Sequence, residues 1–456
     1  MKSIWKSEVE LSKRSELKGS LQVENVVIGA GMAGVLIAWF LQKQGREVVV
    51  VDADEIGGGQ TGNTTAKITS QHGLCYDKMI NKIGKKQAHL YALANENAIH
   101  MFEKIIKEEK IECHFEKKPA YLYTVTDDNV AKLRKEMNAA RMIGIDAVWI
   151  EGERISELPF KIKAAVGFPN QAQFHPLEFL KHLANQLVVY EHTKVLSVKN
   201  KTVYMENAQI KACNIIFATH YPITNIPGFY FLRQHQERSY VVALSNQKSL
   251  NGMYYSIDEG GLSLRSAGDY LLLGGGGHRT GKCICRQKKG ELLGYSFLKN
   301  KVKLYYPEAE IAYSWSAQDC MPHDDVPFIG RYSLFQKNRY VATGFKKWGM
   351  TSSMIAAEII SNQICKNRCE KNNIFSPQRL YFCAGIKNLL IDMWESVSGL
   401  TKGLVGSSQK RCTHLGCKLD WNPEESSWEC SCHGSSYHKN GGLKDNPAKY
   451  NLKQKR

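Results

Sequence analysis

Two short clusters of cysteine and histidine near the end of the 456-residue chain could bind a metal. The first is CTHLGC, from Cys412 to Cys417, and the second is CSCHGS, from Cys430 to Ser435. A structural zinc site is one interpretation, because two Cys and two His also form a zinc ligand set. Each cluster, however, supplies a leading Cys and then a His two or three residues later, whereas zinc fingers usually place both Cys before both His. This order favours a 2Fe-2S cluster with two thiolates on one iron and two imidazoles on the other.

The two clusters resemble the paired binding loops of the Rieske iron–sulfur family, with Ser431 in place of the usual proline. The resemblance implies a complete ligand set and a disulfide that ties the two loops together. Carried over residue by residue, the buried iron is bound by Cys412 and Cys430, the outer iron by His414 and His433, and the disulfide joins Cys417 to Cys432.

The resemblance also places two hydroxyl groups beside the cluster. Ser435 and Tyr437 lie where high-potential Rieske proteins hydrogen-bond a sulfide and a ligand thiolate, which favours the upper part of a range of roughly −150 to +300 mV. The module is expected to be incomplete, because residues 400–410 leave no room for the strands that normally precede the first cluster, although 447–452 resembles the family's closing strand. A core of about 50 residues would then depend on the cluster and the disulfide for stability.

The other end of the chain carries a pattern that binds dinucleotides. A buried-strand run at 26–28 leads into Gly29-x-Gly31-x-x-Gly34, a helical stretch to Gln44, a second strand at 47–51 and then Asp52. The first glycine allows the tight turn, the second lets a pyrophosphate approach the helix N-terminus, and the third lets helix pack on strand. Asp52 follows Gly34 by 18 residues, near the ~20 expected for a carboxylate that binds ribose hydroxyls.

NAD and FAD share this pattern, and later segments favour FAD. The small-residue loop 56–66 could pass close to a phosphate and a flavin ring, and the strand and turn at 341–345 precede a helix that opens at Gly349. These segments resemble FAD-dependent oxidoreductases of the D-amino-acid oxidase and sarcosine oxidase type across residues 20–365. The cofactor-binding residues that this resemblance implies are Gly29, Gly31, Gly34, Asp52, Thr64, Thr65, Val195, Ala218, Thr219, Gly344, Gly349, Met350 and Thr351.

Three further segments resemble landmarks of the same group: 174–180 its helix start, 215–219 its strand, and 321–330 its Pro- and Asp-containing turn. The order of the two parts is similar to a bacterial subfamily with a C-terminal Rieske domain. The implied fold is α/β plus β, with a Rossmann-like FAD-binding domain, an interleaved α+β substrate domain and a small β-rich Rieske module. The expected division is 1–371 for the flavoprotein (FAD-binding parts about 20–75, 165–220 and 325–365), 372–409 for a linker with a docking helix at 386–394, and 410–456 for the Rieske module.

Composition agrees with a large core and an appended module, because 43% of the residues are hydrophobic and 23% are charged. The sequence has no 18-residue apolar run and no secretory h-region at its start, which predicts a cytoplasmic protein. The net charge of +17 favours anionic partners such as acidic electron carriers, or peripheral contact with a lipid surface. Since the lysines are spread out and no nucleic-acid motif accompanies them, nucleic-acid binding is not expected.

The resemblance implies an activity. Flavoenzymes of this type take a hydride from the carbon next to an amine, so the expected donor is an amine or an amino acid. A Rieske cluster carries one electron, which favours a dehydrogenase that passes electrons singly, through exposed His ligands, to an acceptor protein or quinone. Two alternatives stay open: electrons could run from a carrier through the cluster to the flavin, or the short module could serve redox sensing or partner docking.

Catalytic side chains are not determined by the sequence. Arg279 could pair with a substrate carboxylate through its planar guanidinium. His72 lies where some relatives attach flavin covalently. His323 could titrate near neutrality, although its turn motif favours a structural role, and packing is the default expectation for Cys320.

Overall fold

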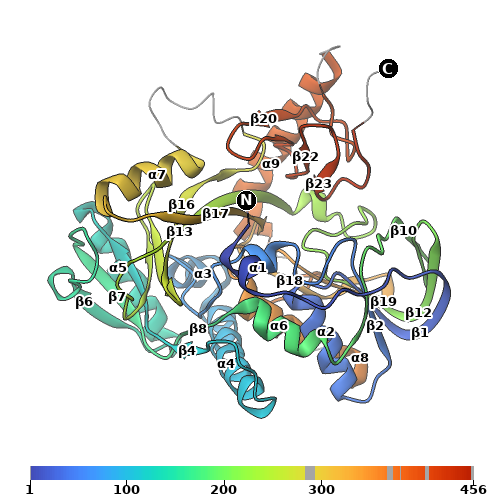
Figure 1. The fold of residues 1–456 in the computed structure, drawn as a ribbon, viewed down its shortest axis with the longest axis horizontal. Helices are drawn as coiled ribbons and strands as arrows, with labels where there is room; N and C mark the ends of the chain where they lie inside the picture. The colour runs from blue at the N-terminus through green and yellow to red at the C-terminus, as the bar shows by residue number, and fades with distance from the viewer. Residues whose placement is uncertain (1, 283–292, 367–372, 380–381, 406–409, 453–456) are drawn as a thin grey trace.

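The computed structural model describes residues 2–282, 293–366, 373–379, 382–405 and 410–452. Figure 1 shows two large sheets side by side and a small C-terminal module lying across them at the top. The first sheet contains β1, β2 and β12, the second contains β13, β16 and β17, and the module contains β20 to β23.

The first sheet has the order β10-β11-β12-β1-β2-β9, with β19 paired to β12 and β18 paired to β19. Its centre is parallel and buried on both faces, as the four consecutive valines of β2 require. Helices α2 (Met32–Lys43) and α8 (Gly349–Cys365) pack together, and α6 (Pro176–Ala184) also packs on α2. The strands are β1 (Gly19–Ile28), β2 (Val48–Val51), β9 (Val188–Tyr190), β10 (Ser197–Lys199), β11 (Thr202–Tyr204), β12 (Ala208–Phe217), β18 (Phe328–Ser333) and β19 (Gln336–Thr343).

The second sheet has the order β17-β13-β16-β15-β14-β5-β7-β6. Its strands are β5 (Ala120–Thr124), β6 (Val148–Glu151), β7 (Ala164–Phe168), β13 (Gln234–Leu244), β14 (Met253–Ser256), β15 (Ser263–Ala267), β16 (Tyr270–Arg279) and β17 (Ile311–Pro322). A small sheet joins β3 (Lys67–Ile68), β8 (Ala172–Gln173) and β4 (Glu116–Lys117). The other helices that precede α8 are α1 (Ile4–Glu8), which packs on α6, and α3 (Tyr76–Ile83), α4 (Lys85–Glu108), α5 (Val130–Met142) and α7 (Gly294–Tyr305).

The C-terminal module is preceded by a long helix, α9 (Phe382–Val405), which contains the predicted docking helix at 386–394. The module itself is an antiparallel sheet of β20 (Asp420–Asn422), β21 (Ser427–Glu429), β22 (Ser436–His438) and β23 (Leu443–Asp445). Its small core gathers the cysteines with Leu419, Tyr437 and Ala448. The predicted closing strand at 447–452 is wrong, because no strand is assigned there.

The predicted fold class is confirmed: strands of the first sheet come from separated parts of the chain, and the second sheet is inserted between them. Within the described residues, no helix combines the length and the apolar character that crossing a membrane requires.

Candidate functional site: a dinucleotide cavity beside a cysteine–histidine cluster

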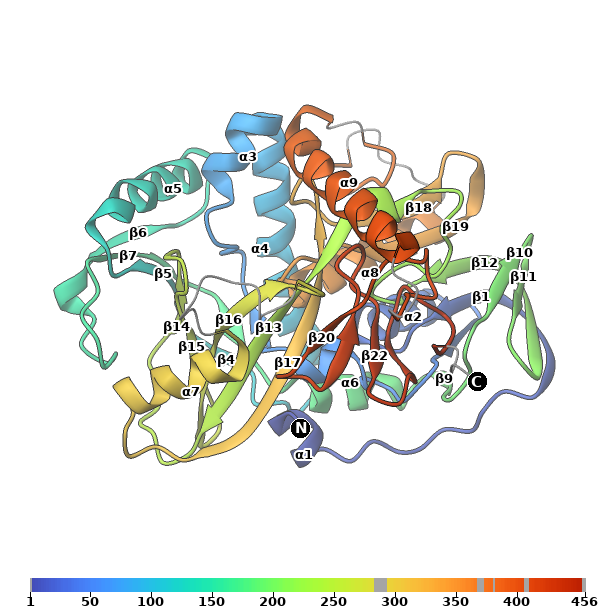
Figure 2. The same ribbon diagram turned by 90° about the horizontal axis from the view of Figure 1, so that it is seen from above.

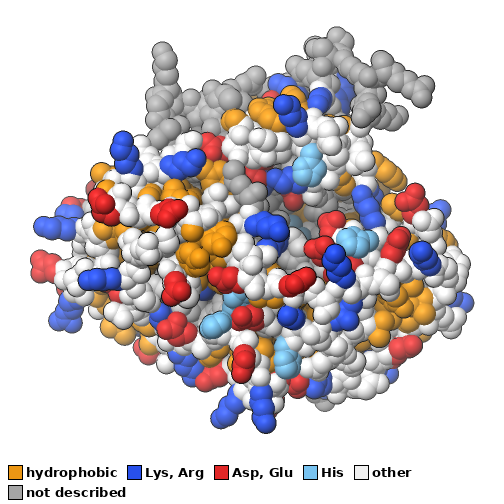
Figure 3. Space-filling model, in the orientation of Figure 1, with side chains coloured by type: hydrophobic (Ala, Val, Ile, Leu, Met, Phe, Trp, Pro, Cys, Tyr) orange, Lys and Arg blue, Asp and Glu red, His pale blue; other side chains and the backbone are white. Residues whose placement is uncertain are grey.

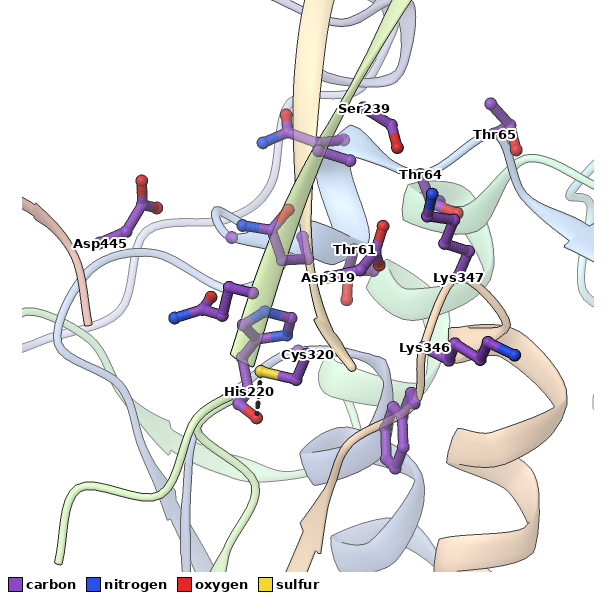
Figure 4. A pocket seen from close by; sticks show the side chains of 18 of the residues that line it. Thr61, Thr64, Thr65, His220, Ser239, Asp319, Cys320, Lys346, Lys347 and Asp445 are labelled. Carbon is purple, nitrogen blue, oxygen red and sulfur yellow. Dashed lines mark hydrogen bonds between the residues drawn. The ribbon is translucent and has the colours of Figure 1, made fainter. Parts of the chain in front are cut away.

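A cavity of about 1040 Å³ lies between the two large sheets and the C-terminal module. Figure 4 shows its charged and polar lining, contributed by separate strands and loops. Ten of the thirteen predicted FAD-binding residues line it: Gly29, Gly31, Asp52, Thr64, Thr65, Val195, Ala218, Thr219, Gly349 and Met350.

Packing explains the glycine pattern at the end of β1. A Cβ on Gly34 would lie 1.8 Å from the carbonyl oxygen of Gly29, so only glycine lets α2 approach this turn. Gly29 has φ of +109°, and a Cβ at this position would lie 2.5 Å from the carbonyl oxygen of Ala218. Gly31 precedes α2 and faces the cavity, where a phosphate would meet the helix N-terminus.

Asp52 is oriented by backbone donors. Its carboxylate accepts hydrogen bonds from the N–H groups of Ala30 at 2.6 Å and Asp54 at 2.9 Å. Burial nevertheless raises the pKa of Asp52. The side chain therefore sits at the cavity wall in the place where the family pattern puts a ribose-binding carboxylate.

Three predicted residues are absent from this lining. Gly34 serves helix packing, and Gly344 forms a turn with φ of +73°. Thr351 is buried at the start of α8, where its hydroxyl donates to the carbonyl of Thr69 at 3.4 Å.

The sequence did not predict three charged side chains of the cavity wall, and it favoured a solvated surface for Lys347. The ammonium of Lys67 donates to the Tyr254 carbonyl at 3.0 Å and to the Ser263 hydroxyl at 2.6 Å, and burial beside Arg265 lowers its pKa to about 7. Burial raises the pKa of Asp319 to about 7. Lys347, on the loop after β19, pairs with Glu237 at 3.2 Å. Figure 4 shows Asp319 and Lys347 on the same side of the cavity.

The four catalytic candidates fall in different places. Cys320 is buried in the cavity wall, and its thiol donates to the carbonyl of His220. His72 is absent from the lining: its ring nitrogens contact the Tyr91 hydroxyl at 2.6 Å and the Thr69 carbonyl at 2.7 Å. A covalent bond from His72 to a flavin is therefore disfavoured by the geometry.

The other two candidates contact α9. Arg279 reaches the edge of the cavity, but its guanidinium binds Asp392 and donates to the carbonyls of Ser431 and Cys432. These contacts disfavour the interpretation of Arg279 as a partner for a substrate carboxylate. His323 also binds Asp392, through Nε2 at 2.5 Å, in keeping with the structural role favoured from its turn.

The two predicted metal-binding clusters meet in the C-terminal module. Cys412 and Cys430 are buried thiols, and the rings of His414 and His433 lie 5.0 Å apart. Cys417 and Cys432 form a disulfide.

The donor set fits a 2Fe-2S cluster. Hydrogen bonding from Cys430 lowers the pKa of Cys412 to about 6, which favours a thiolate at neutral pH. Burial lowers the pKa of His414 to about 4 and that of His433 to about 3, so both imidazoles are neutral. Their Nδ1 atoms are buried and have no hydrogen-bond partner among the described residues, as atoms that bind a metal would require.

Both predicted hydroxyl groups lie beside the thiol of Cys412. The Tyr437 hydroxyl is buried 3.4 Å from Cys412 Sγ and accepts a 2.9 Å hydrogen bond from the Thr413 N–H. Ser435 accepts from the N–H of Ala448 at 3.0 Å and contributes to the low pKa of Cys412. Both positions suit donors to a reduced cluster.

The expectation of exposed His ligands is wrong for His433, whereas His414 is partly exposed. His433 is only 3% exposed, and Nε2 of His414 lies 2.9 Å from the side-chain oxygen of Asn225, in the loop after β12. Gln236 of β13 donates to the His433 carbonyl at 2.7 Å. A Cβ on Gly434 would lie 2.5 Å from Gln236 Cβ, so the module approaches β13 more closely than a side chain would allow. The cysteine–histidine site thus contacts β13 and the loop after β12, while His414 keeps part of its surface exposed.

The module also closes one side of the dinucleotide cavity, because residues 443–446, 448 and 449 belong to its lining. The side-chain amide of Asn446 donates to the carbonyls of Thr219 at 2.8 Å and Tyr221 at 3.1 Å. In Figure 4, His220 and Cys320 lie between Asp445 of the module and the two lysines of the opposite wall. The two sites therefore share a wall.

Buried charges hold the module in this position. Arg238 of β13 is 2% exposed and lies within 3.5 Å of three carboxylates of the module, at Glu425, Glu429 and Asp445. Asp392 of α9 is a second centre, because its carboxylate contacts His235, His323 and Arg279. The sequence offers little signal for Arg238, because it lies in the polar half of β13, QHQERS, and its partners lie far along the sequence.

The fold and the two sites together define a flavoprotein oxidoreductase that carries its own iron–sulfur module. The family model described as FAD dependent oxidoreductase matches residues 25–363, and the model of the Rieske [2Fe-2S] domain matches residues 391–455. The chain therefore belongs to the FAD dependent oxidoreductase family and has a C-terminal Rieske domain. The predicted cofactors, FAD and a Rieske 2Fe-2S cluster, are those that these families imply.

One curated relative aligns with this chain over nearly the full length of both proteins. YhfW of Bacillus subtilis (strain 168), whose name describes a Rieske 2Fe-2S iron–sulfur protein, is 34% identical over 99% of this chain and 96% of its own length. The probable oxidoreductase OrdL of Haemophilus influenzae is 22% identical and is matched over 74% of this chain and 82% of its length.

Solved structures confirm the flavoprotein fold. L-proline dehydrogenase from P. horikoshii aligns with a TM-score of 0.65 and 20% identity, covering 79% of this chain and 98% of that one. Glycine oxidase from Geobacillus kaustophilus aligns with a TM-score of 0.63 and 16% identity, covering 79% of this chain and 99% of that one. L-amino acid deaminase from Proteus vulgaris aligns with a TM-score of 0.62 and 16% identity, covering 82% of this chain and 100% of that one.

Proposed function

We propose that this protein dehydrogenates an amine or amino acid in the cavity and releases the electrons one at a time, through the cluster site, to an acceptor protein or a quinone. The proposed cluster ligands are Cys412, His414, Cys430 and His433. When bound, FAD supplies hydride acceptance and the 2Fe-2S cluster supplies one-electron transfer. The observation that carries the proposal is the shared wall, in which Gln236 lines the cavity and hydrogen-bonds the His433 carbonyl.

The charges in the cavity suit a zwitterionic substrate. The ammonium of Lys347 can attract a carboxylate, and Asp319 can accept a hydrogen bond from an amine. Three of the solved structures with this fold are named for L-proline, glycine and L-amino acids, which supports an amino acid as donor.

Lys67 is the proposed proton acceptor. A substrate amine must be neutral before hydride leaves its carbon, and a buried amine with a pKa near 7 can take its proton near neutral pH. The hydrogen bonds to Tyr254 and Ser263 hold the Lys67 ammonium in the cavity wall.

The test is anaerobic mixing of the purified holoprotein with individual amino acids, following flavin bleaching by absorbance and cluster reduction by EPR. Iron and sulfide analysis first establishes that the cluster is present. We expect flavin to bleach first and the cluster signal to follow. In Cys430→Ser, flavin should still bleach and the cluster signal should be lost, while Cys213→Ser, which changes an exposed free thiol, should match the wild type.

Two outcomes contradict the proposal. If flavin bleaches and a loaded cluster stays oxidised, the module is a sensing or docking appendage. If the flavin is reduced only by a reduced carrier acting through the cluster, the electrons flow in the opposite direction.

A further inference from the structure

The helix that leads into the Rieske domain presents an apolar stripe to solvent. Five large hydrophobic side chains within eight residues of α9 are exposed: Leu390 by 60%, Ile391 by 45%, Met393 by 48%, Trp394 by 72% and Val397 by 54%. Four of them, at positions 390, 393, 394 and 397, recur at the spacing of one helix face. A contiguous exposed stripe of this kind marks a surface that binds something.

The opposite face of α9 is firmly attached. Asp392 is bound by His235 at 2.9 Å, by His323 at 2.5 Å and by Arg279. Glu395 pairs with Lys282 at 2.8 Å, and Gly399 packs against the disulfide. These contacts fix the rotation of the helix, so the apolar stripe cannot turn inward without breaking them.

A basic segment lies beside α9. Helix α3 packs against α9, and the two helices lie side by side in Figure 2. The sequence from Tyr76 to Lys86 contains four lysines and one acid, and all four lysines are exposed. Lys78 pairs with Asp325, and the lysines to test are Lys82, Lys85 and Lys86. Figure 3 shows lysines and arginines interspersed with acidic residues over the face that it presents.

We propose that the apolar stripe of α9 and the lysines of α3 and α4 form a peripheral binding surface for an anionic lipid bilayer. Apolar side chains with an exposed tryptophan enter the interfacial layer, and neighbouring lysines attract acidic headgroups. The net charge of +17 adds long-range attraction to such a surface, and it opposes the alternative in which a second copy of the chain covers the stripe.

The experiment is co-sedimentation of the full-length holoprotein with phosphatidylcholine vesicles, with or without phosphatidylglycerol, at low and high salt. We expect binding to the anionic vesicles at low salt, a blue shift of tryptophan emission, and weak binding to pure phosphatidylcholine. The triple variants Leu390→Ser/Trp394→Ser/Val397→Ser and Lys82→Glu/Lys85→Glu/Lys86→Glu should each weaken binding by at least tenfold.

Matched control variants change similar groups elsewhere. Leu334→Ser/Phe335→Ser removes apolar side chains that are 76% and 90% exposed at the β18–β19 turn, and Lys104→Glu/Lys107→Glu reverses exposed charges farther along α4. Both controls should bind anionic vesicles like the wild type. Flavin and iron contents of every variant show that it has folded.

Absence of binding to anionic vesicles overturns the proposal. Unchanged vesicle binding by the α9 variant overturns it too, and a dimer that this variant converts to monomer would identify a second copy as the occupant. Because the assay needs no substrate or turnover, its result is independent of the proposed redox activity.

Discussion

The side-chain amide of Gln236 donates a 2.7 Å hydrogen bond to the backbone carbonyl of His433. A proposed cluster ligand is thereby joined through one side chain to the wall of the dinucleotide cavity, since Gln236 also lines it. The proposed electron transfer from flavin to cluster is therefore intramolecular in this arrangement.

Removing this hydrogen bond should slow transfer between the two sites. We expect Gln236→Glu, which keeps an acceptor for the Gln318 amide but cannot donate to His433, to slow substrate-driven cluster reduction by about tenfold, the lower end for contacts around metal ligands. Rapid-mixing absorbance and freeze-quench EPR measure the two steps separately. The rate of flavin bleaching should not change, and Gln209→Leu, on exposed β12 surface, is the control. Equal slowing of both steps would assign Gln236 to the cavity alone.

Arg238 should be critical for the attachment of the Rieske domain. Arg238→Met would leave three carboxylates of the domain without their buried partner, a change that costs about 3–5 kcal/mol in comparable sites. Denaturant unfolding, followed by flavin fluorescence and by cluster absorbance, measures the loss. Arg46→Ala breaks a surface ion pair with Glu24 and should leave the free energy of unfolding nearly unchanged. Similar small losses in both variants would show that the buried charges are solvated.

Lys67 should govern the pH dependence of flavin reduction. Its neutral form becomes populated as pH rises through about 7, so the rate of substrate-driven bleaching should increase across that value. Lys67→Met should lower the rate by about 10²–10⁴-fold and flatten this rise. The control Lys104→Met changes an exposed amine.

Asp319 also has a pKa of about 7, so a variant of Asp319 is needed to distinguish its effect on the pH dependence from that of Lys67. Asp319→Asn should raise KM for an amino acid while the rise with pH that belongs to Lys67 persists. If instead the rise disappears in Asp319→Asn and remains in Lys67→Met, the roles of the two side chains are exchanged.

His235 should make the attachment of α9 depend on pH. Burial opposes its charge, but Asp392 and Glu237 outweigh burial and raise the pKa above the ordinary value of about 6.5. A group whose pKa is higher in the folded state than in the unfolded state stabilises the fold fully at pH values below its unfolded-state pKa. This stabilisation is lost as the pH rises through the folded-state pKa. We therefore expect the free energy of unfolding to fall over this window above about pH 6.5.

His235→Asn should remove that part of the pH dependence, measured by denaturant unfolding at several pH values. His100→Asn, at an exposed position of α4, is the control and should retain the wild-type slope. A wild-type slope in His235→Asn would assign the dependence to another group.

Local spacing made the two binding patterns predictable. The Gly29–Gly34 turn, its helix and Asp52 form one βαβ unit, so their roles follow from short-range sequence and were found at the cavity wall or in helix packing. The predicted docking helix at 386–394 is shorter than the observed helix α9, Phe382–Val405. Helical periodicity identifies a helical segment better than it identifies where the helix begins and ends. The charged cavity residues Lys67 and Asp319 were missed, since a lone charge in a strand pattern does not reveal what it faces.

The sequence by itself determined which residues can bind the cofactors, because metal ligands and glycine turns are specified within a few neighbouring positions. Only the tertiary structure decided how the two sites are related. His433 meets Gln236 across 197 positions of sequence, and His414 meets Asn225 across 189. Likewise, the sequence alone allowed Arg279 to bind a substrate, whereas the tertiary structure pairs it with Asp392 of α9. Contacts between distant segments depend on how whole sheets and helices pack, which no local pattern of residues encodes.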